Sequence, residues 1–162
     1  MYIYGGQKCS TENTADMFKY DLIKQTWKRV TPDQESQMQP PSLDSHTAGV
    51  WENQMIVFGG FIGADRGECA NHVLAYDFRT NKWETLFQHN ESEKYPAPRM
   101  AQAMAIVENS LLVFGGTNGE DKFNDLWKFD LQARTWQLLK PEDLLPEVIL
   151  IKFFSLLSLK IA

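Results

Sequence analysis

The sequence predicts an all-β protein built from repeated four-stranded antiparallel units. A short apolar run that ends in two glycines occurs three times in the 162 residues. Each run holds four consecutive strand-forming residues, which is typical of a strand buried on both faces. An aromatic residue followed by aspartate, and then a tryptophan, come after each glycine pair in the same order. A pattern that recurs with its elements in a constant order predicts a repeat fold.

The paired glycines mark the end of the apolar strand in each unit. They follow residues 1–4, 55–58 and 111–114 and are separated by 54 and 56 residues. The three pairs are Gly5 and Gly6, Gly59 and Gly60, and Gly115 and Gly116. Glycine accepts a positive φ and has no Cβ, so a pair of glycines can end a strand abruptly beside a close neighbour.

A hairpin of constant length follows each glycine pair. Its two aromatic positions, seven residues apart, are Tyr20 and Trp27, Tyr76 and Trp83, and Phe129 and Trp136. We expect these aromatic side chains to form the core of each unit. The aspartate after the first aromatic residue is expected to cap the turn by accepting a backbone N–H. The distance from glycine pair to hairpin varies, which predicts a loop that tolerates insertion.

A further strand is expected before the apolar strand of the second and third units. It spans about 46–51 and 100–107, and each copy leads through a short polar turn. The first unit lacks this strand, because the sequence begins at the apolar strand. We therefore divide the chain into four parts: a partial unit at 1–30, complete units at 31–86 and 87–140, and an apolar non-repeat tail at 141–162.

This order of elements resembles the kelch repeat. The resemblance implies that each unit is one blade of a β-propeller, with the blades packed face to face around a central axis. The family pattern also expects an arginine and a histidine near the start of the first strand. The second unit has His46 but Leu43 in the arginine position, and the third has Arg99 but Gln102 in the histidine position.

The sequence contains just under three kelch-type blades. Because closed propellers need at least about four blades, this number predicts an incomplete, open propeller. The chain is expected to be a fragment or one part of an assembly. The tail at 148–162 carries Lys152 and Lys160 and is shorter than the roughly 20 residues that span a bilayer. Its polar residues recur every third position, which suits a short helix. Three interpretations stay open: a cover for the bare face of the third blade, an altered reading frame, and membrane attachment.

Charge and motifs exclude several function classes. The net charge of −5 argues against nucleic acid and against an anionic membrane surface as partners. No phosphate-binding loop or nucleophile elbow occurs. His46, His72 and His89 fall in different elements, so neither a metal site, a catalytic residue nor a cofactor is expected. Two cysteines and the lack of a visible secretory signal predict a reducing, cytoplasmic setting.

The loops at one rim of the predicted blades are the candidate binding surface. Loops 7–16, 61–72 and 117–125 are expected to emerge on the same side as the linkers 31–44 and 87–98, and recognition usually lies in such loops. The candidate partner-binding residues are Phe61, Asp65, Arg66, Arg99, Asn118, Glu120, Asp121 and Lys122. Phe61 and Arg66 are of types enriched at interface hot spots. Arg99 follows a linker and is expected either to contact a partner or to tie two blades together.

These features favour a non-enzymatic protein–protein interaction module of the adaptor or scaffold type, which the kelch resemblance also implies. One alternative is a piece of a propeller-containing enzyme such as a copper-radical oxidase, which would need clustered tyrosine, histidine and cysteine. Another is a truncated isoform without function. Further blades or domains of a longer parent chain are additional candidate partners.

Overall fold

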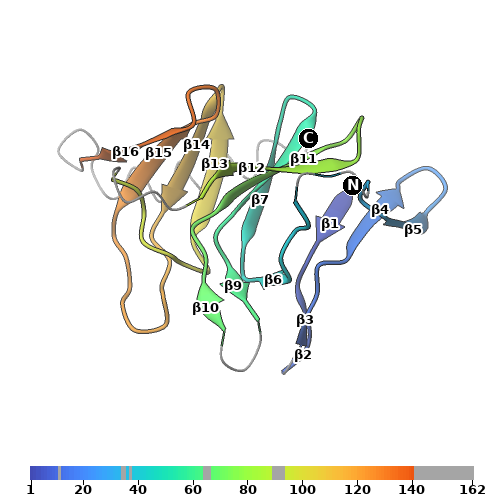
Figure 1. The fold of residues 1–162 in the computed structure, drawn as a ribbon, viewed down its shortest axis with the longest axis horizontal. Coiled ribbons are helices and arrows are strands. Elements are labelled where there is room, and N and C mark those ends of the chain that lie inside the picture. The colour runs from blue at the N-terminus through green and yellow to red at the C-terminus, as the bar shows by residue number, and fades with distance from the viewer. Residues whose placement is uncertain (11, 34–35, 37, 64–66, 89–93, 141–162) are drawn as a thin grey trace.

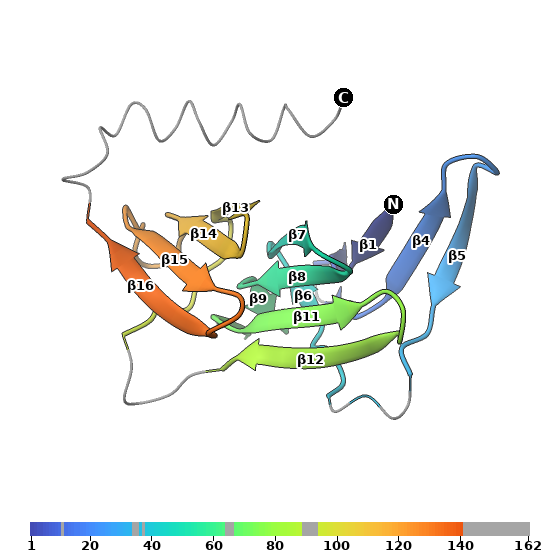
Figure 2. The same ribbon diagram turned by 90° about the horizontal axis from the view of Figure 1, so that it is seen from above.

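The computed structural model describes residues 1–10, 12–33, 36, 38–63, 67–88 and 94–140. Within these ranges the protein is all-β, and three antiparallel sheets stand side by side with the second between the other two (Figures 1 and 2). The predicted fold class, an open stack of antiparallel blades that does not close into a ring, is confirmed. The predicted tail at 141–162 lies outside the described residues.

Each of the three sheets corresponds to one repeat unit. The sheet of blade 1 has three strands, whereas those of blades 2 and 3 have four. Blade 1 consists of β1 (Tyr2–Tyr4), β4 (Met17–Asp21) and β5 (Thr26–Val30). Blade 2 consists of β7 (Thr47–Trp51), β8 (Gln54–Phe58), β11 (Val73–Asp77) and β12 (Lys82–Phe87). Blade 3 consists of β13 (Ala103–Val107), β14 (Ser110–Phe114), β15 (Leu126–Asp130) and β16 (Thr135–Leu139).

The loops that the sequence predicted to be irregular contain short strands of their own. These strands are β2 (Gln7–Cys9) with β3 (Glu12–Asn13), and β6 (Leu43–Asp44) with β9 (Phe61–Ile62) and β10 (Glu68–Cys69). The β6–β9 pair joins the linker before blade 2 to the loop that follows β8. Isolated bridges from Thr117 to Met100 and Lys122 repeat this arrangement in blade 3. The rim loops are therefore ordered by backbone pairing.

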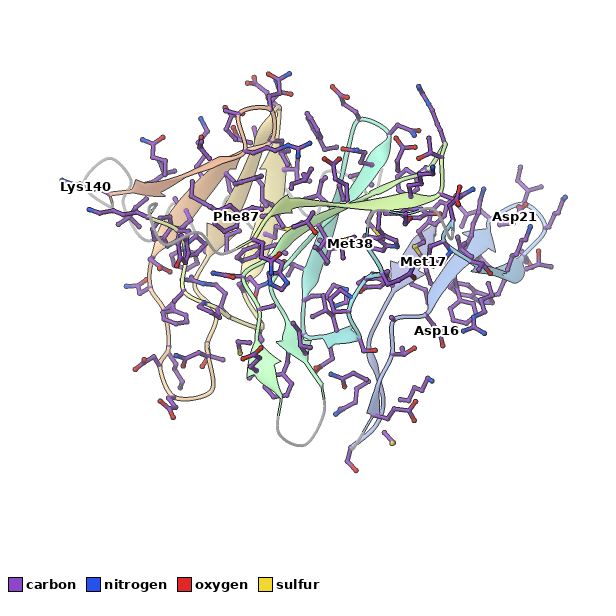
Figure 3. All side chains as sticks on the ribbon, in the orientation of Figure 1. Asp16, Met17, Asp21, Met38, Phe87 and Lys140 are labelled. Carbon is purple, nitrogen blue, oxygen red and sulfur yellow. The ribbon has the colours of Figure 1, made fainter. Side chains whose placement is uncertain are left out.

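The core lies at the two junctions between blades. Met17 and Met38 contribute to the junction of blades 1 and 2, and Phe87 contributes to that of blades 2 and 3 (Figure 3). At the first junction the ring of Tyr4 packs on Trp83, with centroids 4.8 Å apart. At the second the equivalent Phe58 packs on Trp136, with centroids 5.3 Å apart. Blades 2 and 3 thus each present their aromatic pair to the preceding blade.

Trp27 departs from the prediction that all three tryptophans are core residues. Trp83 is 1 % exposed, but Trp27 is 52 % exposed. Both occupy the same position in their blades, and Trp27 stacks on Tyr20 as Trp83 stacks on Tyr76. The difference arises because, among the described residues, no other blade packs against this side of blade 1, so its aromatic pair meets solvent.

The second glycine of a pair brings neighbouring blades into close contact. Gly60 has a φ of 97° and donates its N–H to the Arg99 carbonyl at 2.9 Å. Gly6 donates in the same way to the Leu43 carbonyl at 2.7 Å. The backbone carbonyls of Leu43 and Arg99 therefore accept equivalent interblade hydrogen bonds, although only Arg99 carries a guanidinium. A Cβ on Gly60 would lie 2.7 Å from the Asp44 carbonyl oxygen, so only glycine fits.

Candidate protein-interaction surface

The loops that follow the glycine pairs gather along one rim of the blade stack. In Figure 1 the hairpin β2–β3 and the strands β9 and β10 extend below the blades, on the same side as the loop after β14. We call the described residues 7–10, 12–13, 43–44, 61–63, 67–69 and 117–122 the rim. The turns between the strands of each hairpin lie at the opposite ends of the strands.

Asn13 joins the rim loops of blades 1 and 2. Its side chain is buried, and its amide nitrogen donates to the Asp44 carboxylate at 2.7 Å and to the Phe61 carbonyl at 3.2 Å. It donates to the Gly63 carbonyl as well. This one amide nitrogen thus contacts both the linker strand β6 and the loop after β8 of the neighbouring blade. Sequence reasoning missed Asn13, because its partners lie more than 30 residues away and its own loop has no periodicity.

The rim loops of blades 2 and 3 are joined mainly through backbone groups. The N–H of Arg99 donates to the Ala70 carbonyl at 3.0 Å, and the N–H of Ala70 donates to the Gly60 carbonyl at 2.8 Å. The Cys69 sulfur lies 3.9 Å from the Thr117 carbonyl oxygen. Together with the Asn13 bonds, these contacts make the loops of all three blades one continuous surface.

The loop of blade 3 is held in shape by its own side chains. Asn118 accepts the N–H of Glu120 at 3.0 Å and the N–H of Asp121 at 2.6 Å through Oδ1. The Thr117 hydroxyl donates to the Asp121 carbonyl at 2.6 Å. Asn118 was predicted as a partner-binding residue, and its side-chain oxygen is used inside the loop. Glu120, Asp121 and Lys122 are exposed and available to a partner.

Arg99 lies inside the protein, so its prediction as a partner-binding residue is wrong. Its side chain is 0 % exposed. The guanidinium donates to both carboxylate oxygens of Asp125 at 2.6 and 2.9 Å, to the Gly115 carbonyl at 2.9 Å and to the Ala97 carbonyl at 2.9 Å. It also lies over the Phe123 ring, 4.3 Å from its centroid. The Arg99 side chain therefore ties the linker between blades 2 and 3 to blade 3, and only its backbone groups bond to Ala70 and Gly60 of blade 2.

Asp125 is the anionic partner of this buried cation. Burial raises the pKa of Asp125, but hydrogen bonds from Arg99 and from Trp127 Nε1, together with the Arg99 charge, outweigh burial and place that pKa below its usual value. The carboxylate therefore stays charged at neutral pH, and the clamp persists.

Gln102 occupies the position where the kelch pattern expects a histidine, and it still makes a hydrogen bond between blades 2 and 3. Its amide nitrogen donates to the Phe58 carbonyl at 2.8 Å and lies 3.1 Å from the Thr47 hydroxyl. His46 occupies the equivalent position and packs on Tyr4, with ring centroids 5.3 Å apart. Burial lowers the pKa of His46, against opposing effects of Asp44 and of a hydrogen bond to the Tyr4 backbone. An uncharged donor is therefore sufficient at this position, and glutamine supplies one.

The remaining candidate residues fall into two groups. Phe61 lies in β9, half-buried, and pairs through its backbone with Asp44 and Cys69. Asp65 and Arg66 lie outside the described residues. The structure therefore brings Phe61 and the acidic loop of blade 3 onto one rim and removes Arg99 from it.

The described rim carries more negative than positive charge. Its carboxylates are Glu12, Asp44, Glu68, Glu120 and Asp121, and its ammonium groups are Lys8 and Lys122. The Lys8 ammonium is engaged with Glu12 at 3.0 Å, and both side chains are at least half exposed. A surface with this balance attracts cationic groups.

The opposite ends of the blades are shaped by aspartate-capped turns, as predicted. Asp21, Asp77 and Asp130 each accept two backbone N–H groups of the following turn at 2.7–3.0 Å. These hydrogen bonds lower the pKa of all three carboxyl groups. A polar cleft of about 590 Å³ lies between the turns of blades 2 and 3. Arg134 and Glu84 pair across it at 2.6 Å, which joins the turn of blade 3 to strand β12 of blade 2.

The described residues contain neither a cluster of metal-binding side chains nor a membrane-spanning helix. No group of three or more histidine, cysteine, aspartate or glutamate side chains is placed to hold a metal ion there. The described part of the chain also contains no helix with the length and apolar character needed to cross a membrane.

Comparison with known proteins agrees with this architecture. A family model described as the KLHDC2/KLHL20/DRC7 Kelch-repeats domain matches residues 1–150. This chain belongs to the kelch-repeat family. The match covers all three blades, including the three-stranded first one. The kelch resemblance seen in the glycine, aromatic and tryptophan spacing is therefore confirmed.

Curated relatives include longer proteins that combine this region with other parts. Kelch domain-containing protein 10 of Homo sapiens is 33 % identical over 159 residues, which cover 91 % of this chain and 35 % of the relative. Acyl-CoA-binding domain-containing protein 5 of Arabidopsis thaliana is 32 % identical, with 85 % of this chain and 22 % of the relative covered. Serine/threonine-protein phosphatase BSL2 of Arabidopsis thaliana is 29 % identical, with 80 % and 12 % covered. The chain spans about a third of the length of the first of these, and its kelch relatives indicate a protein-interaction module in general terms.

Proposed function

We propose that this chain is a non-enzymatic protein-binding module, of the adaptor or scaffold type, that recognises a partner through its rim. The observation that carries the proposal is the joining of the rim loops across all three blades by Asn13, by the Ala70–Arg99 backbone bond and by the Cys69–Thr117 contact. Loops that are already ordered before a partner binds lose little conformational entropy on binding. The expected cytoplasmic setting is part of the same proposal.

The charge of the rim supports a partner with a basic segment. Glu120 and Asp121 are exposed on a loop that is fixed by Asn118, and Glu68 is exposed on the neighbouring blade. Complementary charge of this kind speeds encounter and selects among partners more than it adds affinity. Binding is accordingly expected to weaken as salt concentration rises.

A comparison of two charge-reversed variants tests the proposal. The rim variant carries Glu120→Lys with Asp121→Lys. Its control carries Glu52→Lys with Glu108→Lys, which changes net charge equally in exposed turns at the opposite ends of blades 2 and 3. Each protein is immobilised, exposed to cell extract and compared by quantitative mass spectrometry.

The expected result is a set of proteins that the unmodified chain and the control retain and that the rim variant loses. Loss of the same proteins by both variants would show that binding follows overall charge. Equal retention by all three chains would show that the rim loop of blade 3 does not carry recognition. Either of these results would overturn the proposal.

A further inference from the structure

One face of the short rim sheet β6–β9–β10 carries a carboxylate beside an aromatic ring (Figure 1). In the register of this sheet, Phe61 of β9 lies directly opposite Asp44 on one side and Cys69 on the other. Residues directly opposite in an antiparallel pair point to the same face, with Cβ atoms about 4.5–5.5 Å apart. All three residues are half-buried. We call the Asp44 and Phe61 side chains the rim pair.

The other face of this sheet is used for packing. Leu43 and Ile62 lie opposite each other on it, and both pack on the core at the junction of blades 1 and 2. The rim pair therefore lies on the face turned away from that core. A Cβ on Gly67 would lie 2.7 Å from Cε1 of Phe61, so the ring rests on the bare backbone of Gly67. The loop itself thus supports the ring at the surface.

The Asp44 carboxylate is held in place without a cationic partner. Its Oδ1 accepts the Asn13 amide N–H at 2.7 Å, and its Oδ2 accepts the Ser45 hydroxyl at 3.0 Å. Both donors are neutral, and no ion pair joins Asp44 to a lysine or arginine among the described residues. Burial raises the pKa of Cys69, and the Asp44 charge raises it further, as expected for neighbours on one face.

A buried acceptor beside Asp44 also lacks a donor. Asn13 Oδ1 belongs to the amide that binds Asp44, and it makes no hydrogen bond with the described residues. The amide nitrogen faces the Asp44 carboxylate and the carbonyls of Phe61 and Gly63, which uses its two N–H groups. Buried polar atoms without a partner are rare in folded proteins. This part of the rim therefore leaves acceptors, and no donor, for a partner.

We propose that the rim pair binds the guanidinium of an arginine side chain in the basic segment of a partner. A guanidinium has parallel N–H groups that reach both oxygens of one carboxylate, and its flat faces stack on aromatic rings. Each Asp44 oxygen uses one hydrogen bond within the protein and keeps the capacity for another. A lysine ammonium is a compact point charge without this geometry. The inference rests on the proposed function, because it names the group that the rim recognises.

Selection from a random peptide library by the immobilised full chain tests the inference. Peptides that bind the unmodified chain are expected to be enriched in arginine at one position. Asp44→Asn removes the charge but keeps an oxygen that can accept from Asn13, and it is expected to abolish the enrichment. Phe61→Leu keeps an apolar side chain without the ring and is expected to weaken it. Circular dichroism checks the fold of each variant.

Glu12→Gln is the matched control. It removes one exposed negative charge from another part of the rim, so it is expected to leave the arginine enrichment unchanged. Equal loss of enrichment in Glu12→Gln and Asp44→Asn would show that overall rim charge is sufficient and would overturn the inference. Selection of lysine as often as arginine would overturn it for the same reason.

A selected peptide then measures the contribution of the guanidinium charge. Citrulline has the shape of arginine without its charge. Replacing the arginine with citrulline is expected to weaken binding to the unmodified chain about tenfold and to change binding to Asp44→Asn little. Equal weakening for both chains would place the arginine elsewhere and overturn the inference. If Asp44→Asn fails to fold, the same comparison with Phe61→Leu decides it.

The same selection separates this inference from the proposed function. Peptides selected without any preference for arginine, and lost by the variant with Glu120→Lys and Asp121→Lys, would overturn the rim pair and support the rim. Peptides that depend on arginine but are retained by that variant would support the rim pair and count against the blade 3 loop. A library that yields no selected peptide would overturn the inference and leave the proposed function to its own comparison.

Discussion

Replacing Arg99 with methionine is expected to destabilise the protein more than any surface substitution. Methionine keeps much of the length and apolar volume of the side chain and removes only the guanidinium. The Asp125 carboxylate then loses both of its Arg99 hydrogen bonds, and the carbonyls of Gly115 and Ala97 lose a donor. These groups lie where the linker enters blade 3, so the lost bonds loosen the attachment of that blade.

The magnitude follows from the burial of the two partners. Breaking a buried ion pair by removing one partner costs about 3–5 kcal/mol. Arg99 is fully buried, but the Asp125 side chain is 29 % exposed and keeps its hydrogen bond from Trp127 at 2.7 Å. The carboxylate left behind is therefore partly solvated and still has a donor. We expect a loss near the low end of that range, about 3 kcal/mol in the free energy of unfolding.

Urea denaturation at one fixed protein concentration measures this loss, with tryptophan fluorescence and circular dichroism recorded together to check that the transition is two-state. Arg29→Met is the matched control, because Arg29 also pairs with an aspartate, Asp16, but is 68 % exposed. Exposed pairs contribute about 0–1 kcal/mol. A loss for Arg99→Met no larger than that of the control would refute the assignment of Arg99 as the clamp between the linker and blade 3.

Three further comparisons test the junctions. Gly60→Ala is expected to lower the free energy of unfolding by more than about 2 kcal/mol, because a Cβ there adds a clash to the strain of positive φ. Gly119 has a similar φ but open space around it, so Gly119→Ala should cost about 1 kcal/mol in the same denaturation assay. Trp83→Ala is expected to cost about 3–5 kcal/mol and Trp27→Ala much less; similar losses would contradict the packing described. Burial lowers the pKa of His46 below 6.5, so protonation of His46 is harder in the folded than in the unfolded state. The stability that this difference supplies is fully present above pH 6.5 and is lost as the pH falls below that value. His46→Gln should reduce this dependence, and identical pH profiles would count against it.

The repeat frame could be predicted from sequence because its determinants are local and periodic. A four-residue apolar run and a seven-residue spacing survive in each unit, so strands such as β8 and β14 follow directly from the pattern. The aspartate caps are also local, since Asp77 accepts N–H groups only two and three residues ahead. These features need no knowledge of distant partners.

The rim could not be predicted in the same detail because its contacts are long-range. The strands β6 and β9 are two residues each, too short to show any alternation, and they pair across different loops. Arg99 looked like a surface residue because its partner Asp125 is 26 residues away in sequence. Trp27 has the sequence pattern of Trp83, but among the described residues only Trp83 has a neighbouring blade packed against it, so one is exposed and the other buried.

Hydrogen exchange of the chain, free and bound to a partner identified by the variant comparison, is the most direct test of the rim as the recognition surface. Mass spectrometry reports the change in exchange for peptides from each part of the chain. We predict slower exchange on binding in the described rim segments, above all 117–122 and 67–69. Protection confined to the turns at 52–53, 78–81 and 131–134, or to the side of blade 1 that carries Tyr20 and Trp27, would contradict the account.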